Sequence, residues 1–193
     1  MKTIMDILTP SNIQFMIFTG AKYSLLLAIG ALFFGVILGI IGAALKLSKH
    51  FVLRAIGNVY VEIFRGTPML LQIMFLYLAV PTVVQSITGQ RFQADPYVCG
   101  LIAMSLNSGA YQVELIRSGI LGVDKGQWEA CETIGLNYVQ TMRYVILPQA
   151  FKRIIPPLIS EFITLIKDSS LIFTIGAVEL LATASVIGAN TFN

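Results

Sequence analysis

The sequence contains little charge for its length. Of its 193 residues, 12% are charged and 56% are apolar, whereas soluble domains carry about 25% charged residues. Because about half of the usual charge is missing, we expect lipid to be the solvent for much of the surface. The net charge of +3 is too small to indicate a nucleic acid, and we expect no nucleic-acid partner.

Histidine and cysteine are also scarce, which argues against an enzyme. His50 lies in a basic loop without a second ligand nearby, and Cys99 and Cys131 lack metal-type or redox-type spacing. We therefore expect no metal site, no catalytic residues and two unpaired thiols. The phosphate-loop pattern G-x-x-x-x-G-K-[ST] is absent as well, so we expect neither ATP hydrolysis nor a cofactor in this chain.

Long uncharged runs are what the sequence has in abundance. The run between Lys22 and Lys46 forms a helix of about 34 Å at 1.5 Å per residue, and a hydrocarbon core is about 30 Å thick. Gly35, Gly39 and Ala43 recur there at four-residue intervals, which predicts a face for close helix packing. The sequence therefore predicts an all-α integral membrane protein, a multi-span helical bundle in a single domain over residues 1–193. Four spans are expected, at about residues 20–46, 56–85, 96–121 and 149–176.

Prolines and polar residues interrupt the second and third runs. Pro68 either occupies the first turn of the second helix or kinks a helix that began near Ile56, and Pro81 and Gly89 are expected to lead out of it. The third run is polar for a membrane helix, so its polar side chains should face protein or a wet pathway. These side chains are Ser105, Asn107, Ser108 and Gln112.

The basic residues predict the orientation. They are concentrated between the first and second expected spans and between the third and fourth, and basic loops face the cytoplasm. We therefore expect both of these segments in the cytoplasm and the N-terminus outside. The residues are Lys46, Lys49, Arg54, Arg65, Arg117, Lys125, Arg143, Lys152 and Arg153.

A polar segment at about residues 124–147 lies in the second of these basic regions. Asp124 with Gln127, and Asn137 with Gln140, resemble helix-start signals. With Gly135 as a stop between them, they predict two short helices, and Pro148 is expected to separate the second helix from the fourth span. The segment fits either an amphipathic helix on lipid or a helix docked in a groove of a cytoplasmic partner. Its glutamates, close to an anionic leaflet, favour the protein partner.

Several residues of this segment carry a family resemblance. Glu129 and Ala130, then Gly135, then Leu147 and Pro148, resemble the EAA loop of permease subunits in bacterial ABC importers, with Cys131 in place of the second alanine. "EIFRGTP" (residues 62–68), which includes the signature residues Arg65, Gly66, Thr67 and Pro68, and "EFITLIKDSSL" (residues 161–171) are similar to the polar amino-acid uptake branch. The chain is thus identified as a member of that family from about residue 20 onward.

The resemblance implies a type I importer fold, a mechanism and several partners. In that family the loop forms a cytoplasmic coupling helix that sits in a cleft of an ATPase subunit. The residues carried over for ATPase coupling are Trp128, Glu129, Ala130, Gly135, Leu147 and Pro148. The expected partners are ABC ATPase subunits, which hold ATP and magnesium, a second permease that is the same or homologous, an extracytoplasmic solute-binding protein, the amino-acid substrate and the lipid bilayer. The family usually has a fifth span, so residues 177–193 are expected to be an outer segment or the start of a truncated last helix.

The fourth expected span contains three charged residues, each costing about 2.5–3.5 kcal/mol at a bilayer centre. Glu161 and Asp168 are seven residues apart and share a helical face with Thr164. One interpretation places Glu161, Thr164, Asp168 and Ser169 along a substrate path, where two carboxylates suit a basic amino acid. The other is structural: Lys167 pairs with an acid elsewhere, and Asp168, Ser169 and Ser170 cap a broken helix. For Arg65 to Pro68 the structural interpretation is favoured.

Two other classes of protein remain possible at this point. An ion-gradient-driven secondary transporter or channel subunit explains the intramembrane charges but not the capped helical pair. A membrane scaffold that docks a cytoplasmic protein explains the helical pair but not the charges.

Overall fold

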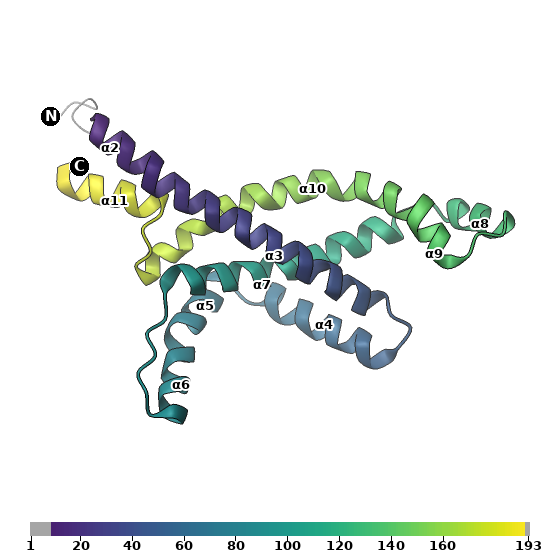
Figure 1. The fold of residues 1–193 in the computed structure, drawn as a ribbon, viewed down its shortest axis with the longest axis horizontal. Helices are drawn as coiled ribbons and strands as arrows, with labels where there is room; N and C mark the ends of the chain where they lie inside the picture. Colours follow the sequence, from purple (N-terminus) through teal and green to yellow (C-terminus); the bar gives the residue numbers. More distant parts are fainter. Residues whose placement is uncertain (1–8, 192–193) are drawn as a thin grey trace.

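The structure, a computed structural model, describes residues 9–191, and these fold as helices without a strand (Figure 1). The first helix begins at Pro10, about ten residues before the expected start of the first span. The Thr9 side chain caps it by accepting a hydrogen bond from the Asn12 N–H. It runs without interruption to Leu47. Its parts are α2 (Pro10–Phe15), a π-helical turn η1 (Met16–Ala21) and α3 (Lys22–Leu47).

Close packing of α3 against α7 (Pro96–Leu121) forms the centre of the fold. A Cβ atom on Gly35 would lie 2.8 Å from Nε2 of Gln112, and one on Gly39 would lie 2.7 Å from Cβ of Gln112. Ala43 is 2% exposed and packs with Val113. The predicted small-residue face is therefore confirmed, because any larger side chain at these glycines would push the two helices apart.

Helix α7 has the bounds that were expected for the third span. Asp95 caps it by accepting a hydrogen bond from the Val98 N–H, and Pro96 occupies the first turn, where its missing N–H is not needed. The four polar side chains of α7 are buried by the surrounding helices, as expected. Lipid does not reach these groups, and this burial explains how so polar a helix occupies the middle of an apolar protein.

The range 56–85 is not one helix in the structure. Helix α4 (Phe51–Gly66) packs along α3 and ends before Thr67 and Pro68, which are both extended. A second helix follows, made of α5 (Met69–Met74), the π turn η2 (Phe75–Ala79) and α6 (Val80–Thr88), and it leaves the bundle in a different direction (Figure 1). Pro81 lies inside α6, so the exit is at Gly89 alone, whose φ of 70° suits a residue without a side chain.

The fourth expected span is joined to the end of the polar segment, and this corrects the expected break at Pro148. Helix α8 (Lys125–Thr133) stands apart, but one helix then runs continuously from Tyr138 to Ile175. A π turn directly before Pro148 widens the helix, which accommodates the proline ring and its missing N–H. The parts are α9 (Tyr138–Thr141), η3 (Met142–Ile146), α10 (Leu147–Asp168) and the 3₁₀ turn η4 (Ser169–Ile175).

The last helix, α11 (Leu180–Thr191), bends by 56° from the preceding one. The carboxylate of Glu179, which is 1% exposed, accepts hydrogen bonds of 2.8 Å from the N–H groups of Leu181 and Ala182. Two backbone donors thus stabilise this buried charge at a helix start. The Leu180 N–H also donates to the Ser24 hydroxyl, which attaches α11 to the first helix.

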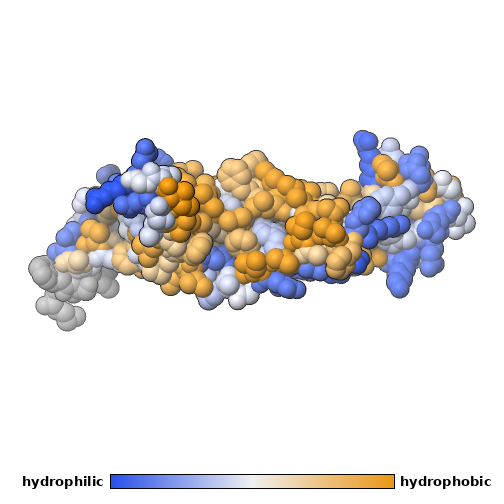
Figure 2. Space-filling model, turned by 90° about the horizontal axis from the view of Figure 1, so that it is seen from below, coloured by the Kyte–Doolittle hydropathy of each residue, from blue (hydrophilic) through white to orange (hydrophobic). Residues whose placement is uncertain are grey.

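Within residues 9–191, two helices are long and apolar enough to cross a membrane, Pro10–Leu47 and Met69–Thr88. A third crossing results if the bent pair Tyr138–Ile175 and Leu180–Asn190 counts as one span. Figure 2 shows, on the face that it displays, an apolar surface between hydrophilic ends. Such a belt is what a bilayer requires of the surface that it contacts.

Candidate functional site

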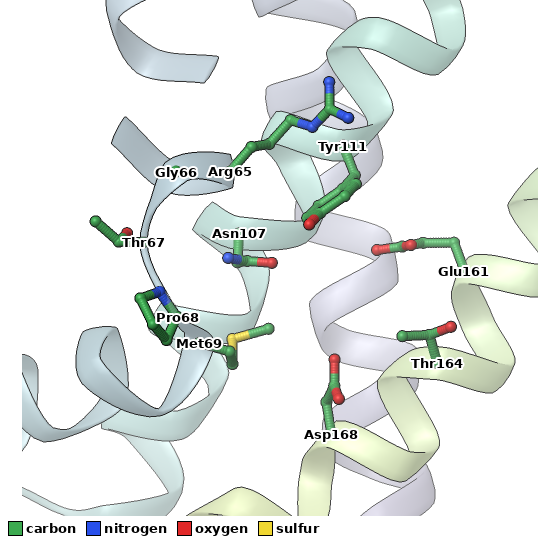
Figure 3. A pocket seen from close by; sticks show the side chains of 10 residues that line it. All are labelled: Arg65, Gly66, Thr67, Pro68, Met69, Asn107, Tyr111, Glu161, Thr164 and Asp168. Carbon is green, nitrogen blue, oxygen red and sulfur yellow. The ribbon is translucent and has the colours of Figure 1, made fainter. Parts of the chain in front are cut away.

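The break between α4 and α5 faces α7 and α10 across a cavity of about 570 Å³ (Figure 3). Three of the four residues expected along a substrate path line it, namely Glu161, Thr164 and Asp168, all from α10. Ser169 does not, because it is 1% exposed and its hydroxyl donates to the carbonyl of Ile166. The remaining lining residues come from the break and from α7: Arg65, Gly66, Thr67, Pro68, Met69, Asn107 and Tyr111.

Two side-chain amides hold the helix break open. The Gln72 amide donates to the carbonyls of Phe64 (2.9 Å) and Thr67 (3.1 Å) and to the Thr67 hydroxyl (2.8 Å). The Asn107 amide donates to the same Phe64 carbonyl at 2.8 Å and to Oε1 of Gln72 at 3.1 Å. Two of the carbonyls that the broken helix leaves without helical partners, those of Phe64 and Thr67, are thereby satisfied, so the break is an ordered wall of the cavity.

The two carboxylates of the cavity are free of ion pairs within the described residues. The ion pairs there join Glu114 to Lys46 and to Arg117. Lys167 is exposed and lines no described cavity, so the acid partner expected under the structural interpretation is not found in this part of the chain. Asp168 makes no capping hydrogen bond, and only the hydroxyls of Ser169 and Ser170 bond to carbonyls of the helix end.

A second cavity, of about 330 Å³, continues from the first. Three residues line both cavities, namely Arg65, Tyr111 and Glu161. The Arg65 guanidinium carbon lies 4.9 Å from the centre of the Tyr111 ring, a cation–π contact. The sequence indicated the acids of this site by their spacing, but it did not indicate Tyr111, Met69 or the role of Gln72. A polar residue within "MLLQIM" was the available signal for Gln72.

The polar segment forms a compact unit at the end of the bundle. Asp124 accepts a hydrogen bond from the Gly126 N–H and caps α8, while Gln127 accepts one from the Gln149 amide instead of completing a capping box. The second predicted start is confirmed, because Asn137 and Gln140 form a reciprocal capping box. Gly135 has φ of 78° where α8 stops, which favours glycine.

The residues expected to contact an ATPase are placed by this unit. The rings of Trp128 and Tyr138 stack with centres 6.4 Å apart, and Cys131, also on α8, is 3% exposed. Glu129 and Ala130 face outward on α8. Leu147 and Pro148 are not on α8. They lie in the first turn of α10, within the continuous helix that begins at Tyr138.

Comparisons with known proteins define the class. The family described as binding-protein-dependent transport system inner membrane component matches residues 31–193. The chain is 40% identical to the putative glutamine transport system permease protein GlnP of Rickettsia conorii over 93% of this chain and 79% of that one. The L-cystine transport system permease protein TcyB of Bacillus subtilis is 44% identical over 90% and 71% of the two chains. The arginine transport system permease protein ArtQ of the same organism is 38% identical over 92% and 78%.

A solved structure agrees with these relatives. The crystal structure of an amino acid ABC transporter with histidines superposes with a TM-score of 0.82 at 34% identity, covering 92% of this chain and 79% of that one. The matches define a membrane-spanning permease of the amino-acid branch of ABC importers. The chain belongs to the family of binding-protein-dependent transport system inner membrane components, and it is a multi-pass protein of the inner membrane.

Proposed function

We propose that this chain forms the path of a polar amino acid across the inner membrane, driven by ATP hydrolysis in separate ATPase subunits. The observation that carries the proposal is the cavity in which Glu161 and Asp168 of α10 face the broken helix without ion pairs. Two carboxylates that are not neutralised by an ion pair attract a cation, so a basic amino acid such as arginine, lysine or histidine is the proposed substrate. The relatives are named for glutamine, cystine and arginine, and the last of these supports the proposal.

Helix α8 is proposed to dock on an ABC ATPase through the face that contains Glu129 and Ala130. Its caps, the Trp128–Tyr138 stack and the hydrogen bond to Gln149 make it stiff enough to transmit a displacement to α10. This chain neither binds nor hydrolyses ATP in the proposal, and a second permease and an extracytoplasmic binding protein complete the assembly.

The proposed orientation puts α8 in the cytoplasm and the N-terminus outside. The α3–α4 turn and the α8–α9 pair lie at one end of the long axis, and the start of α2 lies at the other (Figure 1). The basic residues Lys49 and Arg54 lie at or next to the first of these turns and Lys125 and Arg143 in or next to the helical pair, so the positive-inside rule supports this orientation.

Uptake by the reconstituted permease, ATPase and binding protein tests the proposal. We expect ATP-dependent uptake of a basic amino acid, which Glu161→Gln or Asp168→Asn reduces at least about tenfold because a charge partner is lost. Glu62→Gln, which alters an exposed acid outside the cavities on α4, is the control and should not change uptake. Unchanged uptake after both cavity substitutions, or uptake driven by a proton or sodium gradient without the ATPase, would contradict the proposal.

A further inference from the structure

The Arg65 guanidinium occupies the path without an acidic partner. The described residues contain two ion pairs, both made by Glu114, and neither includes Arg65. Its guanidinium carbon lies 4.9 Å from the centre of the Tyr111 ring, over the ring face. A ring face holds the plane of a guanidinium but occupies none of the five N–H donors on its edge. Arg65 is therefore oriented while its donors remain available.

Arg65 also lies at the junction of the two cavities. It is shared, together with Tyr111 and Glu161, by the cavities of about 570 and 330 Å³. The smaller cavity extends along α7 to Ser118 and along α10 to Pro157, which is the direction of the end that contains α8. These three side chains therefore line the junction between the two cavities.

The charged side chains that line the two cavities differ in sign and in position. Glu161 and Asp168 come from α10, and Arg65 comes from α4 on the opposite side of Tyr111 (Figure 3). Glu114 also lines the smaller cavity, but Lys46 and Arg117 already neutralise it. Among the described residues, the path thus offers two carboxylates without ion pairs on one wall and a guanidinium without an ion pair on the other. This arrangement complements a molecule that carries both an ammonium or guanidinium group and a carboxylate.

We propose that Arg65 binds the α-carboxylate of the substrate, so that the permease itself requires an amino acid and rejects the corresponding amine. The inference rests on the proposed function and adds a selectivity that the acids alone do not supply. Arginine suits this role because its planar fork donates two parallel hydrogen bonds to a carboxylate, which lysine cannot do. Tyr111 is a positioning residue, because its ring fixes the plane of the guanidinium. A bound amino acid would connect α4 to α10, whereas an amine would contact α10 alone.

The test measures binding to the permease–ATPase complex in lipid nanodiscs without the binding protein, which would apply a selection of its own. Labelled L-arginine is displaced by unlabelled L-arginine, by agmatine, which lacks the carboxylate, or by L-argininamide, in which it is neutral. The unsubstituted complex should prefer L-arginine to both analogues by at least about tenfold, since a charge-assisted bidentate pair is lost. Because this comparison needs no substitution, it does not depend on whether a variant assembles.

Variants locate the preference at one side chain. Arg65→Gln should bring the affinity for L-arginine down to that for agmatine and leave agmatine binding unchanged, and Arg65→Lys should restore part of the difference. Tyr111→Phe, which keeps the ring, should preserve the preference, and Tyr111→Leu should reduce it. Arg54→Gln is the matched control, because Arg54 is an exposed arginine of the same helix that lines neither cavity.

The possible failures are distinguishable. If the unsubstituted complex binds none of L-arginine, L-lysine, L-histidine or L-glutamine, the proposed function itself is wrong. If it binds L-arginine but agmatine competes equally, or if Arg65→Gln keeps the original preference, the permease is an amino-acid path in which Arg65 has no part in recognition, and this inference is overturned.

Discussion

Pro68 and Pro148 both lie within long, largely helical stretches of sequence. The helix ends before Pro68, but it continues through Pro148. At Thr67 and Pro68 the backbone is extended. The Gln72 amide donates a hydrogen bond to the Thr67 carbonyl, and the Asn107 amide donates one to the Phe64 carbonyl. At Pro148 the helix widens into a π turn just before the proline and stays helical. Pro81 follows the π turn η2 in the same way. The helix therefore ends before Pro68, where side chains replace the lost backbone partners, and continues through Pro81 and Pro148, which follow π turns.

The largest expected effect comes from removing those partners. Gln72→Leu should lower the free energy of unfolding by about 2–4 kcal/mol. The substitution leaves the Thr67 carbonyl without a partner, which costs about 1–3 kcal/mol, and leaves the Phe64 carbonyl with Asn107 as its side-chain donor. The thermal midpoint of the purified permease measures this loss. Gln85→Leu, an exposed glutamine of α6, should change it little. Equal midpoints for the two variants would show that the amides do not hold the break.

A smaller effect is expected at the continuous helix. Trp128→Ala removes the stack on Tyr138, worth about 0.5–1.5 kcal/mol, and should loosen α8 from the helix that begins at Tyr138. We expect the fold to survive and substrate-stimulated ATPase activity of the complex to fall. Tyr144→Ala, which removes a 67% exposed aromatic ring of the same helix, is the control. If the substrate stimulates the ATPase activity of the Trp128→Ala complex fully, the stack on Tyr138 is not needed for coupling.

At the break itself, Pro68→Ala should reduce stability by about 0.4–1 kcal/mol. The present φ of −61° at position 68 already suits proline, so alanine mainly increases the freedom of the unfolded chain. Chemical denaturation in detergent measures the difference. A gain in stability would mean that the extended conformation is strained and that the helix tends to close.

The smallest effect is expected for Pro148→Ala, a change within about 0.5 kcal/mol. The π turn already accommodates the proline ring, and alanine returns an N–H to a helix that has adapted to its absence. The same denaturation measurement should therefore give different results for the two prolines. A loss at position 148 larger than that at position 68 would invalidate the comparison.

The sequence predicted the features that depend on residue spacing within one helix. The expected third span, 96–121, has the bounds of α7, and the approach of α3 to α7 follows from Gly35 and Gly39. The shared face of Glu161, Thr164 and Asp168 follows from their spacing, and all three line one cavity.

The features that the sequence did not predict depend on distant partners or on irregular turns. The sequence names Pro68 as a helix start or a kink, but it does not indicate that Asn107, which lies 43 residues beyond Phe64, stabilises the break. The π turn before Pro148 is likewise a response to crowding that helix propensity does not describe. The cap formed by Glu179 depends on burial against the rest of the bundle.

The uninterrupted helix from Tyr138 to Ile175 has a mechanical consequence. Tyr138, which stacks on α8, and Asp168, which lines the cavity, are separated by about 45 Å of helix at 1.5 Å per residue. If this helix moves as a rigid lever about its Tyr138 end, a tilt of about 5° displaces Asp168 by roughly 4 Å over that length. A motion too small to disturb the stacked rings would then be amplified into a shift about as wide as an amino-acid headgroup.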